Sequence, residues 1–145
     1  MTCRWAGLLV GAWAALACAE GAGGVDLQAL RSPILFRGDA ATAYRDPAAV
    51  YQDGWFRLFF TLVRIEDGLP YSYLAWSKSR DLASWSAPAV LTPRDRSLNF
   101  GSPGNVVRFG DEWVLCLQTY PRPNGEKYGN AESRLWTMRS RDLET

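Results

Sequence analysis

Residues 46–58 read DPAAVYQDGWFRL, and residues 102–115 read SPGNVVRFGDEWVL. In each copy a polar residue precedes a proline, a short apolar run follows, and a turn containing glycine leads to a tryptophan. A further apolar run and the tetrapeptide SRDL, at 79–82 and 140–143, complete each copy. A β-rich repeat of roughly 50 residues is typical of a propeller blade. The repeat therefore predicts an all-β chain that contains two blades of a propeller.

The alternation of apolar and polar residues predicts the strands within each copy. Asp53-Gly54 is a strong signal for a hairpin turn. The second copy ends before an outer strand, so we expect the chain to be the first part of a longer propeller, with blades at about 44–92 and 100–145. Another β architecture, such as a sandwich, also uses short strands and glycine turns and stays the alternative. The predicted strands are 33–36, as a strand that closes the ring from the far side, then 48–51, 55–63, 71–77 and 87–91, and then 105–109, 112–119 and 132–139.

Composition excludes several kinds of chemistry. The 145 residues contain no histidine, which rules out Ser-His-Asp and Cys-His catalysis within the chain and the commonest transition-metal ligand. The formal net charge is +1 without a block of like charges, so no nucleic-acid partner is expected. We expect neither a metal nor a cofactor, and any catalysis would depend on carboxylates.

The first 19 residues have the features of a signal peptide. Arg4 precedes an apolar run at 5–17 that is too short to span a bilayer comfortably, and small residues near Cys18 form a cleavage pattern. Residues 20–32 then form a spacer. We expect a secreted or periplasmic protein without a transmembrane segment in its mature form, and lipidation at Cys18 stays open. Cys116, in an apolar run, is expected to be a buried, inert thiol.

The segment Tyr44-Arg45-Asp46-Pro47, followed by an apolar strand and a glycine turn, resembles the five-bladed propeller glycoside hydrolases. It is most similar to family 43, with kinship to families 32, 62, 68 and 130. The SRDLASW segment at 79–85 also resembles a turn that recurs in their blades. The resemblance covers residues 33–145, about two of five blades. It implies hydrolysis of arabinofuranosyl or xylosyl linkages of an oligo- or polysaccharide, with inversion.

Asp46 is the candidate catalytic residue. Glycoside hydrolysis needs two carboxyl groups on opposite sides of the sugar, and the resemblance implies that Asp46 is the general base. Arg45 beside it would bind a carboxylate or a sugar hydroxyl. Two alternatives stay open: Asp46 merely begins a strand, or it holds sugar hydroxyls, as an Arg-Asp-Pro aspartate does in families 32 and 68.

The second copy has Ser102 where the first has Asp46, so it supplies no second carboxylate there. Other polar or aromatic residues near the same rim are expected to contact the sugar. The general acid is expected outside the chain, so the chain alone is expected to be inactive. A non-catalytic sugar-binding module and a phosphorylase like family 130 are the alternative functions. The expected substrate-binding residues are Arg45, Asn99, Phe100, Ser102, Asn105 and Gln118.

Asp81 and Asp142 occur at matching positions of the two copies, in the turn before the outer strand. An aspartate in such a turn accepts hydrogen bonds from nearby backbone N–H groups. We therefore predict that both are structural and not catalytic.

Overall fold

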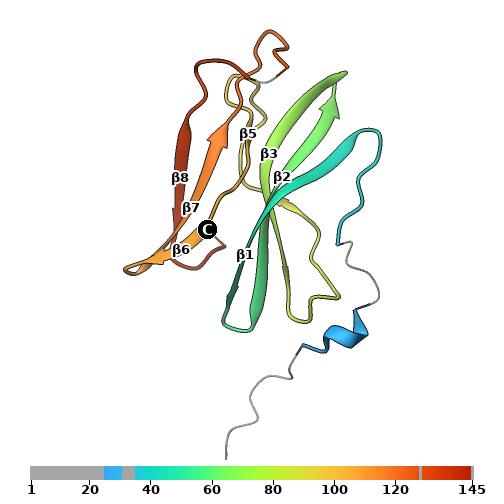
Figure 1. Ribbon diagram of the computed structural model, residues 1–145, viewed down its shortest axis with the longest axis vertical. Coiled ribbons are helices and arrows are strands. Elements are labelled where there is room, and N and C mark those ends of the chain that lie inside the picture. The colour runs from blue at the N-terminus through green and yellow to red at the C-terminus, as the bar shows by residue number, and fades with distance from the viewer. Residues whose placement is uncertain (1–24, 31–34, 128, 145) are drawn as a thin grey trace, which may run out of the picture.

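The computed structural model describes residues 25–30, 35–127 and 129–144. This part of the chain forms two four-stranded antiparallel sheets that lie side by side (Figure 1). A short 3-10 helix, η1 (Leu27–Ala29), precedes them, and no α-helix occurs in the described ranges. The predicted all-β class is confirmed, and the two sheets fit a partial propeller. The predicted signal peptide at 1–19 lies outside the described residues.

The first sheet is a meander in which each strand pairs with the next. Its strands are longer than predicted, because Asp67-Gly68 forms a two-residue turn with φ angles of 54° and 74°. The predicted strand end at 63 and strand start at 71 are therefore wrong, and the predicted outer strand at 87–91 is reduced to two residues. The strands are β1 (Thr42–Gln52), β2 (Trp55–Glu66), β3 (Leu69–Ser79) and β4 (Ala89–Val90).

The second sheet has a split inner strand. β5 (Phe100–Gly101) and β6 (Val106–Phe109) both pair with β7 (Glu112–Thr119), and β8 (Leu135–Ser140) pairs with the other edge of β7. β7 has the predicted bounds, whereas the predicted inner strand at 105–109 omitted β5. The reason is that the backbone leaves the ladder between β5 and β6, around Pro103, which has no N–H to donate.

The main core lies between the two sheets. Alternate side chains of each sheet face the other sheet, as the pleat of a strand requires. The Arg57 side chain, which is only 7% exposed, forms an ion pair with Glu144 at 2.8 Å and joins the two sheets at one end of this core. The buried residues of the core are Ala48, Phe59 and Leu74 from the first sheet and Leu115, Leu117 and Leu143 from the second.

The opposite face of the first sheet carries a second apolar cluster, which includes Phe60, Leu62 and Tyr73. Phe36 covers part of it, with its ring 5.3 Å from those of Tyr44 and Phe60. Leu35 and Phe36 are not in a strand, so the described half of the predicted strand 33–36 is wrong, and its other half lies outside the described residues.

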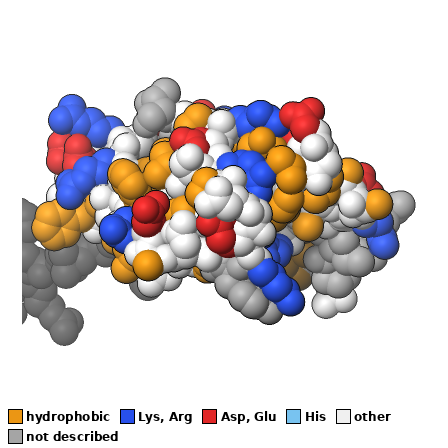
Figure 2. Space-filling view, turned by 90° about the horizontal axis from the view of Figure 1, so that it is seen from above, with side chains coloured by type: hydrophobic (Ala, Val, Ile, Leu, Met, Phe, Trp, Pro, Cys, Tyr) orange, Lys and Arg blue, Asp and Glu red, His pale blue; other side chains and the backbone are white. Residues whose placement is uncertain are grey.

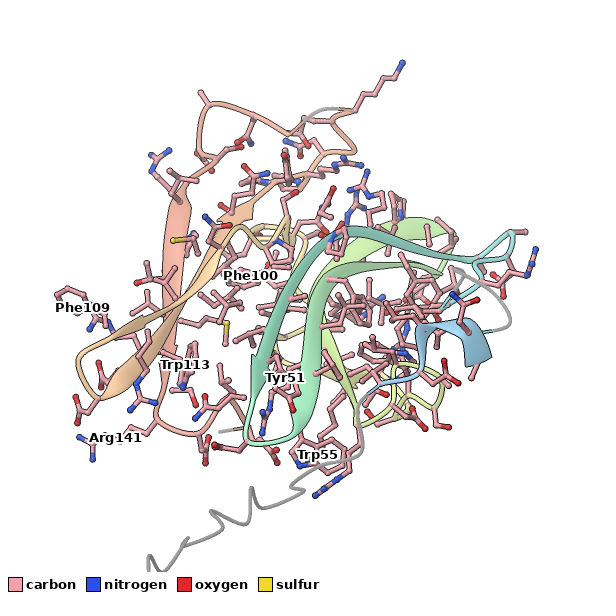
Figure 3. The ribbon with its side chains drawn as sticks, turned by 60° about the horizontal axis from the view of Figure 1, so that its bottom comes forward. Tyr51, Trp55, Phe100, Phe109, Trp113 and Arg141 are labelled. Carbon is pink, nitrogen blue, oxygen red and sulfur yellow. The ribbon has the colours of Figure 1, made fainter. Side chains whose placement is uncertain are left out.

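The opposite face of the second sheet is exposed in the described part of the chain. Cys116 is exposed there, so the prediction of a buried thiol is wrong. The reason is strand alternation: Leu115 and Leu117 face the first sheet, and Cys116 between them points the other way. Phe109 on the neighbouring strand is 74% exposed and projects from the edge of the molecule (Figure 3).

The two SRDL segments fold alike. Ser79 Oγ accepts hydrogen bonds from the backbone N–H groups of Asp81 and Leu82, and Ser140 Oγ accepts the matching pair in the second copy. Asp81 Oδ1 accepts from the backbone N–H groups of two later residues, which lowers the pKa of this carboxyl below its usual value. Asp142 Oδ1 accepts from the N–H of Glu144. Both aspartates are therefore structural, as predicted.

Candidate active site

Asp46 sits at a bulge in the inner strand of the first sheet. Arg45 is paired with Thr61 and Ala48 with Phe59, so Asp46 and Pro47 together stand opposite one residue of β2. Asp46 has a φ of 54°, in the left-handed region that few residues other than glycine and Asx adopt. Bulges of this kind redirect a side chain and are common beside active sites. Here the bulge turns the exposed Asp46 carboxylate away from the regular alternation of β1.

One oxygen of the Asp46 carboxylate is anchored by two hydroxyl groups. Thr61 Oγ1 donates to Asp46 Oδ2 at 2.9 Å, and Ser102 Oγ donates to the same oxygen at 3.1 Å. Thr61 Oγ1 also accepts a hydrogen bond of 2.6 Å from the backbone N–H of Ser102. Thr61 is fully buried, which holds this three-residue network rigid. Asp46 Oδ1 accepts no hydrogen bond from the described residues and can therefore act on a ligand.

Ser102 matches Asp46 in conformation as well as in sequence. Its φ is 46°, it also precedes a proline, and it also stands where the inner strand leaves its ladder. Because serine replaces a carboxylate here, the second sheet contributes a hydrogen-bond donor to Asp46 instead of a second acidic group. The network thus joins equivalent positions of the two repeats.

A cavity of about 290 Å³ opens beside this network. It lies between the two sheets, toward the end of the molecule that carries the turn after β2. Charged and apolar side chains are interspersed at the surface of that end (Figure 2). The cavity is lined by Arg45, Asp46, Ser72, Ser102, Tyr120 and Arg122.

The structure brings together three of the residues that the sequence predicted for the site: Arg45, Asp46 and Ser102. Gln118 does not line the cavity, but its Nε2 donates a hydrogen bond to the hydroxyl oxygen of Tyr120, which does. Gln118 can therefore orient a cavity residue without lining the cavity itself.

The other three predicted contacts lie elsewhere. Asn99 is only 1% exposed, and its Oδ1 accepts a hydrogen bond of 2.7 Å from the backbone N–H of Ser72, so it supports the cavity wall from inside. Phe100 packs edge-on against Trp136, with ring centroids 6.0 Å apart. Asn105 is exposed and is not among the residues that line the cavity.

Four residues of the site were not predicted as site residues: Thr61, Ser72, Tyr120 and Arg122. Thr61 and Ser72 lie inside strands of mixed composition, and no sequence pattern distinguishes them from ordinary strand residues. Tyr120 and Arg122 begin the loop after β7, where a binding role is common. Their position in that loop is the only signal that could have identified them.

Two further carboxylates, at the turn after β2, are used in ion pairs. Arg94 Nε lies 2.7 Å from Glu66 Oε2, and another nitrogen of Arg94 lies 2.5 Å from Asp67 Oδ2. The hydrogen bond from Arg94 lowers the pKa of Glu66. Burial, together with the hydrogen bond to Glu66, raises the pKa of Tyr73 to about 12. This cluster stabilises the turn after β2, and none of its members lines the cavity.

Within the described ranges, no three Cys, Asp or Glu side chains are grouped closely enough to hold a metal ion. The described residues also contain no helix that is long and apolar enough to cross a membrane.

Comparison with known proteins found similarity in structure only. No protein-family model matches the chain, and no curated protein matches it by sequence. A solved structure from Parabacteroides distasonis, provisionally assigned as a glycoside hydrolase, superposes with a TM-score of 0.53 and 18% identity over 72% of this chain. A family 117 glycoside hydrolase of the marine bacterium Zobellia galactanivorans superposes with a TM-score of 0.57 and 15% identity over 74% of this chain.

The chain spans 31% and 38% of those two proteins. At such low identity the likeness concerns the fold alone. The predicted resemblance to glycoside hydrolases is supported at the level of the fold, and neither structure is described as a member of family 43. The described residues therefore share the architecture of part of a glycoside hydrolase.

Proposed function

We propose that this chain carries part of the active site of a glycoside hydrolase and that Asp46 is its general base. The observation that supports this most directly is the state of the Asp46 carboxylate. One oxygen is anchored by Thr61 and Ser102, and the other is free beside a cavity. A general base needs this combination of fixed geometry and one available lone pair.

In the proposed reaction, Asp46 Oδ1 takes a proton from a water molecule. The water oxygen then bonds to the anomeric carbon while the glycosidic C–O bond breaks on the opposite face of the ring, which inverts the configuration. A second carboxyl group protonates the departing oxygen. No second carboxylate lines the cavity formed by the described residues, so we expect the acid from another part of the complete protein. The resemblance to family 43 favours arabinofuranosyl or xylosyl linkages.

The test is the substitution Asp46→Asn in the complete protein, with turnover of arabinofuranosyl and xylosyl substrates measured beside a melting curve. Asparagine keeps the shape of aspartate but cannot accept the proton, so turnover should fall by about 10²–10⁴-fold with little change in melting temperature. Asp53→Asn, in the exposed hairpin turn of the same sheet, is the matched control and should retain full turnover. Full turnover of a folded Asp46→Asn protein would rule out Asp46 as the base.

Two other functions have a specific observation in their favour. The single carboxylate in the cavity fits a non-catalytic sugar-binding module, for which Asp46→Asn would weaken binding while no turnover exists in the wild type. The two arginines of the cavity fit a phosphorylase, in which phosphate replaces water, and turnover would then require phosphate.

We also propose that the protein is exported, on the basis of the signal-like sequence at 1–19. The mass of the mature protein distinguishes the two forms of this proposal. Cleavage after Ala19 would leave an unmodified chain, whereas lipidation would leave a mature chain that begins with a modified Cys18.

A further inference from the structure

We infer that the sugar bound beside Asp46 carries an anionic group, such as the carboxylate of a uronic acid, which Arg45 and Arg122 hold. The inference rests on the proposed function and narrows its substrate class. It concerns the part of the substrate next to the reacting bond and leaves the cleaved linkage as proposed above.

The cavity lining carries an excess of positive charge. Two arginines and one aspartate line a space of about 290 Å³. This volume is near the lower end of the range for small-molecule sites, which is about 300–1,000 Å³. A neutral sugar would need only hydrogen bonds from such a site. The excess positive charge in a confined space favours a ligand with a negative charge of its own.

The side chains of these two arginines have no other partner among the described residues. Arg57, Arg94 and Arg139 each form an ion pair with a glutamate. The side chains of Arg45 and Arg122 form no ion pair and donate no hydrogen bond within the described ranges. In particular, Arg45 does not pair with the neighbouring Asp46. Their charges are therefore available to a ligand.

The Arg122 side chain contains a buried donor. Its Nε is buried and has no hydrogen-bond partner in the described structure. A buried donor without a partner is costly, because it has lost its contact with water. The two terminal nitrogens of the Arg122 guanidinium are not buried in this way, so an anionic group in the cavity would bind there and offset the charge of the guanidinium. A guanidinium also suits a carboxylate in particular, since its parallel N–H groups match the two carboxylate oxygens.

Tyr120 adds a donor beside the arginines. Its hydroxyl oxygen accepts a hydrogen bond from Gln118, which leaves the hydroxyl proton for another acceptor. Tyr120 and Arg122 both belong to the loop after β7, whereas Arg45 comes from the first sheet. The anion would therefore be held by residues of the first sheet and of the loop after β7.

The experiment is a calorimetric titration of the full chain with four probes: methyl β-D-glucuronide, methyl β-D-glucoside, a sulfated monosaccharide and inorganic phosphate. The glucuronide should bind at least about tenfold more tightly than the glucoside, because a hydrogen bond to a charged group adds more than one to a neutral group. In the Arg122→Gln and Arg45→Gln variants, the ratio of the glucoside and glucuronide dissociation constants should fall to nearly one. Arg141→Gln, at an exposed residue 3.8 Å from Asp111, is the matched control and should leave it unchanged.

Raised salt should also reduce the preference, since it screens the charge interaction. Tighter binding of the sulfated sugar than of the glucuronide would support an anion site but assign it to sulfate. Equal binding of glucuronide and glucoside would overturn the inference and leave the glycoside hydrolase proposal intact. Phosphate that binds as tightly as the glucuronide in an Arg122-dependent manner would overturn it in favour of the phosphorylase. Absence of binding by every probe to a folded chain would contradict the proposed function as well.

Discussion

Removal of the Thr61 hydroxyl should both destabilise the protein and misplace Asp46. Thr61→Val keeps the branched shape of the side chain but deletes the hydroxyl group. The wild-type hydroxyl donates to Asp46 Oδ2 at 2.9 Å and accepts from the backbone N–H of Ser102 at 2.6 Å. A hydrogen bond to a charged group contributes about 1.5–3 kcal/mol, and an N–H group left without a partner costs about 1–3 kcal/mol. Because Ser102 is partly exposed, water recovers some of this energy, and we expect a loss of about 2–4 kcal/mol.

Urea denaturation measures this loss directly. With a slope of about 2 kcal/mol per M, the midpoint of unfolding should fall by about 1–2 M. If the proposed function is correct, turnover under conditions where the variant is folded should also fall by about 10- to 100-fold, since Asp46 loses one of its two anchors.

Thr119→Val is the matched control. Thr119 is as deeply buried as Thr61, and its Oγ1 accepts a hydrogen bond of 3.1 Å from the backbone N–H of Arg134, away from Asp46. Thr119→Val should lower the free energy of unfolding by about 1 kcal/mol and leave turnover unchanged. A wild-type urea midpoint for Thr61→Val would refute the importance of the network for stability. Equal turnover of the two variants would refute its role in positioning Asp46.

Three other predictions concern stability. Gly101→Ala should lower the free energy of unfolding by about 1–3 kcal/mol, seen as an earlier urea midpoint, because the new Cβ would lie only 3.1 Å from Thr61 Cγ2. Burial and a hydrogen bond to a glutamate raise the pKa of Tyr73 from 10.0 to about 12. The contribution of Tyr73 to the free energy of unfolding should therefore be complete below pH 10 and be lost as the pH rises toward 12. Tyr73→Phe should remove that alkaline decline from unfolding curves. Hydrogen bonds from Lys78 and, to a smaller extent, from Arg57 lower the pKa of Glu144. The contribution of Glu144 to the free energy of unfolding should therefore be present above pH 4.5 and be lost below it. Glu144→Gln should cost about 1–2 kcal/mol at pH 7, as measured by urea denaturation, since it leaves Arg57 buried without its ion pair.

The sequence was sufficient for features that depend on local periodicity. Strand alternation and glycine turns predicted the all-β class, and β7 has the predicted bounds because its alternation is unbroken. The repeated SRDL turns were also predictable, because a serine or aspartate that bonds to backbone N–H groups two or three residues away acts within one short segment. Asp46 itself was proposed as a site residue through the resemblance of residues 44–47 to propeller glycoside hydrolases.

Only the tertiary structure determined what surrounds Asp46. Thr61 lies 15 residues away along the chain and Ser102 lies 56 residues away, so their shared contact with Asp46 follows from strand pairing and from the packing of one sheet on the other. The same packing buries Asn99, although its sequence neighbourhood suggested a residue at the rim. It also brings Tyr120 and Arg122 to the same cavity as Arg45. A periodic pattern shows which face of a strand a residue occupies, but it does not show which distant residue that face meets, because the meeting depends on the relative placement of two sheets.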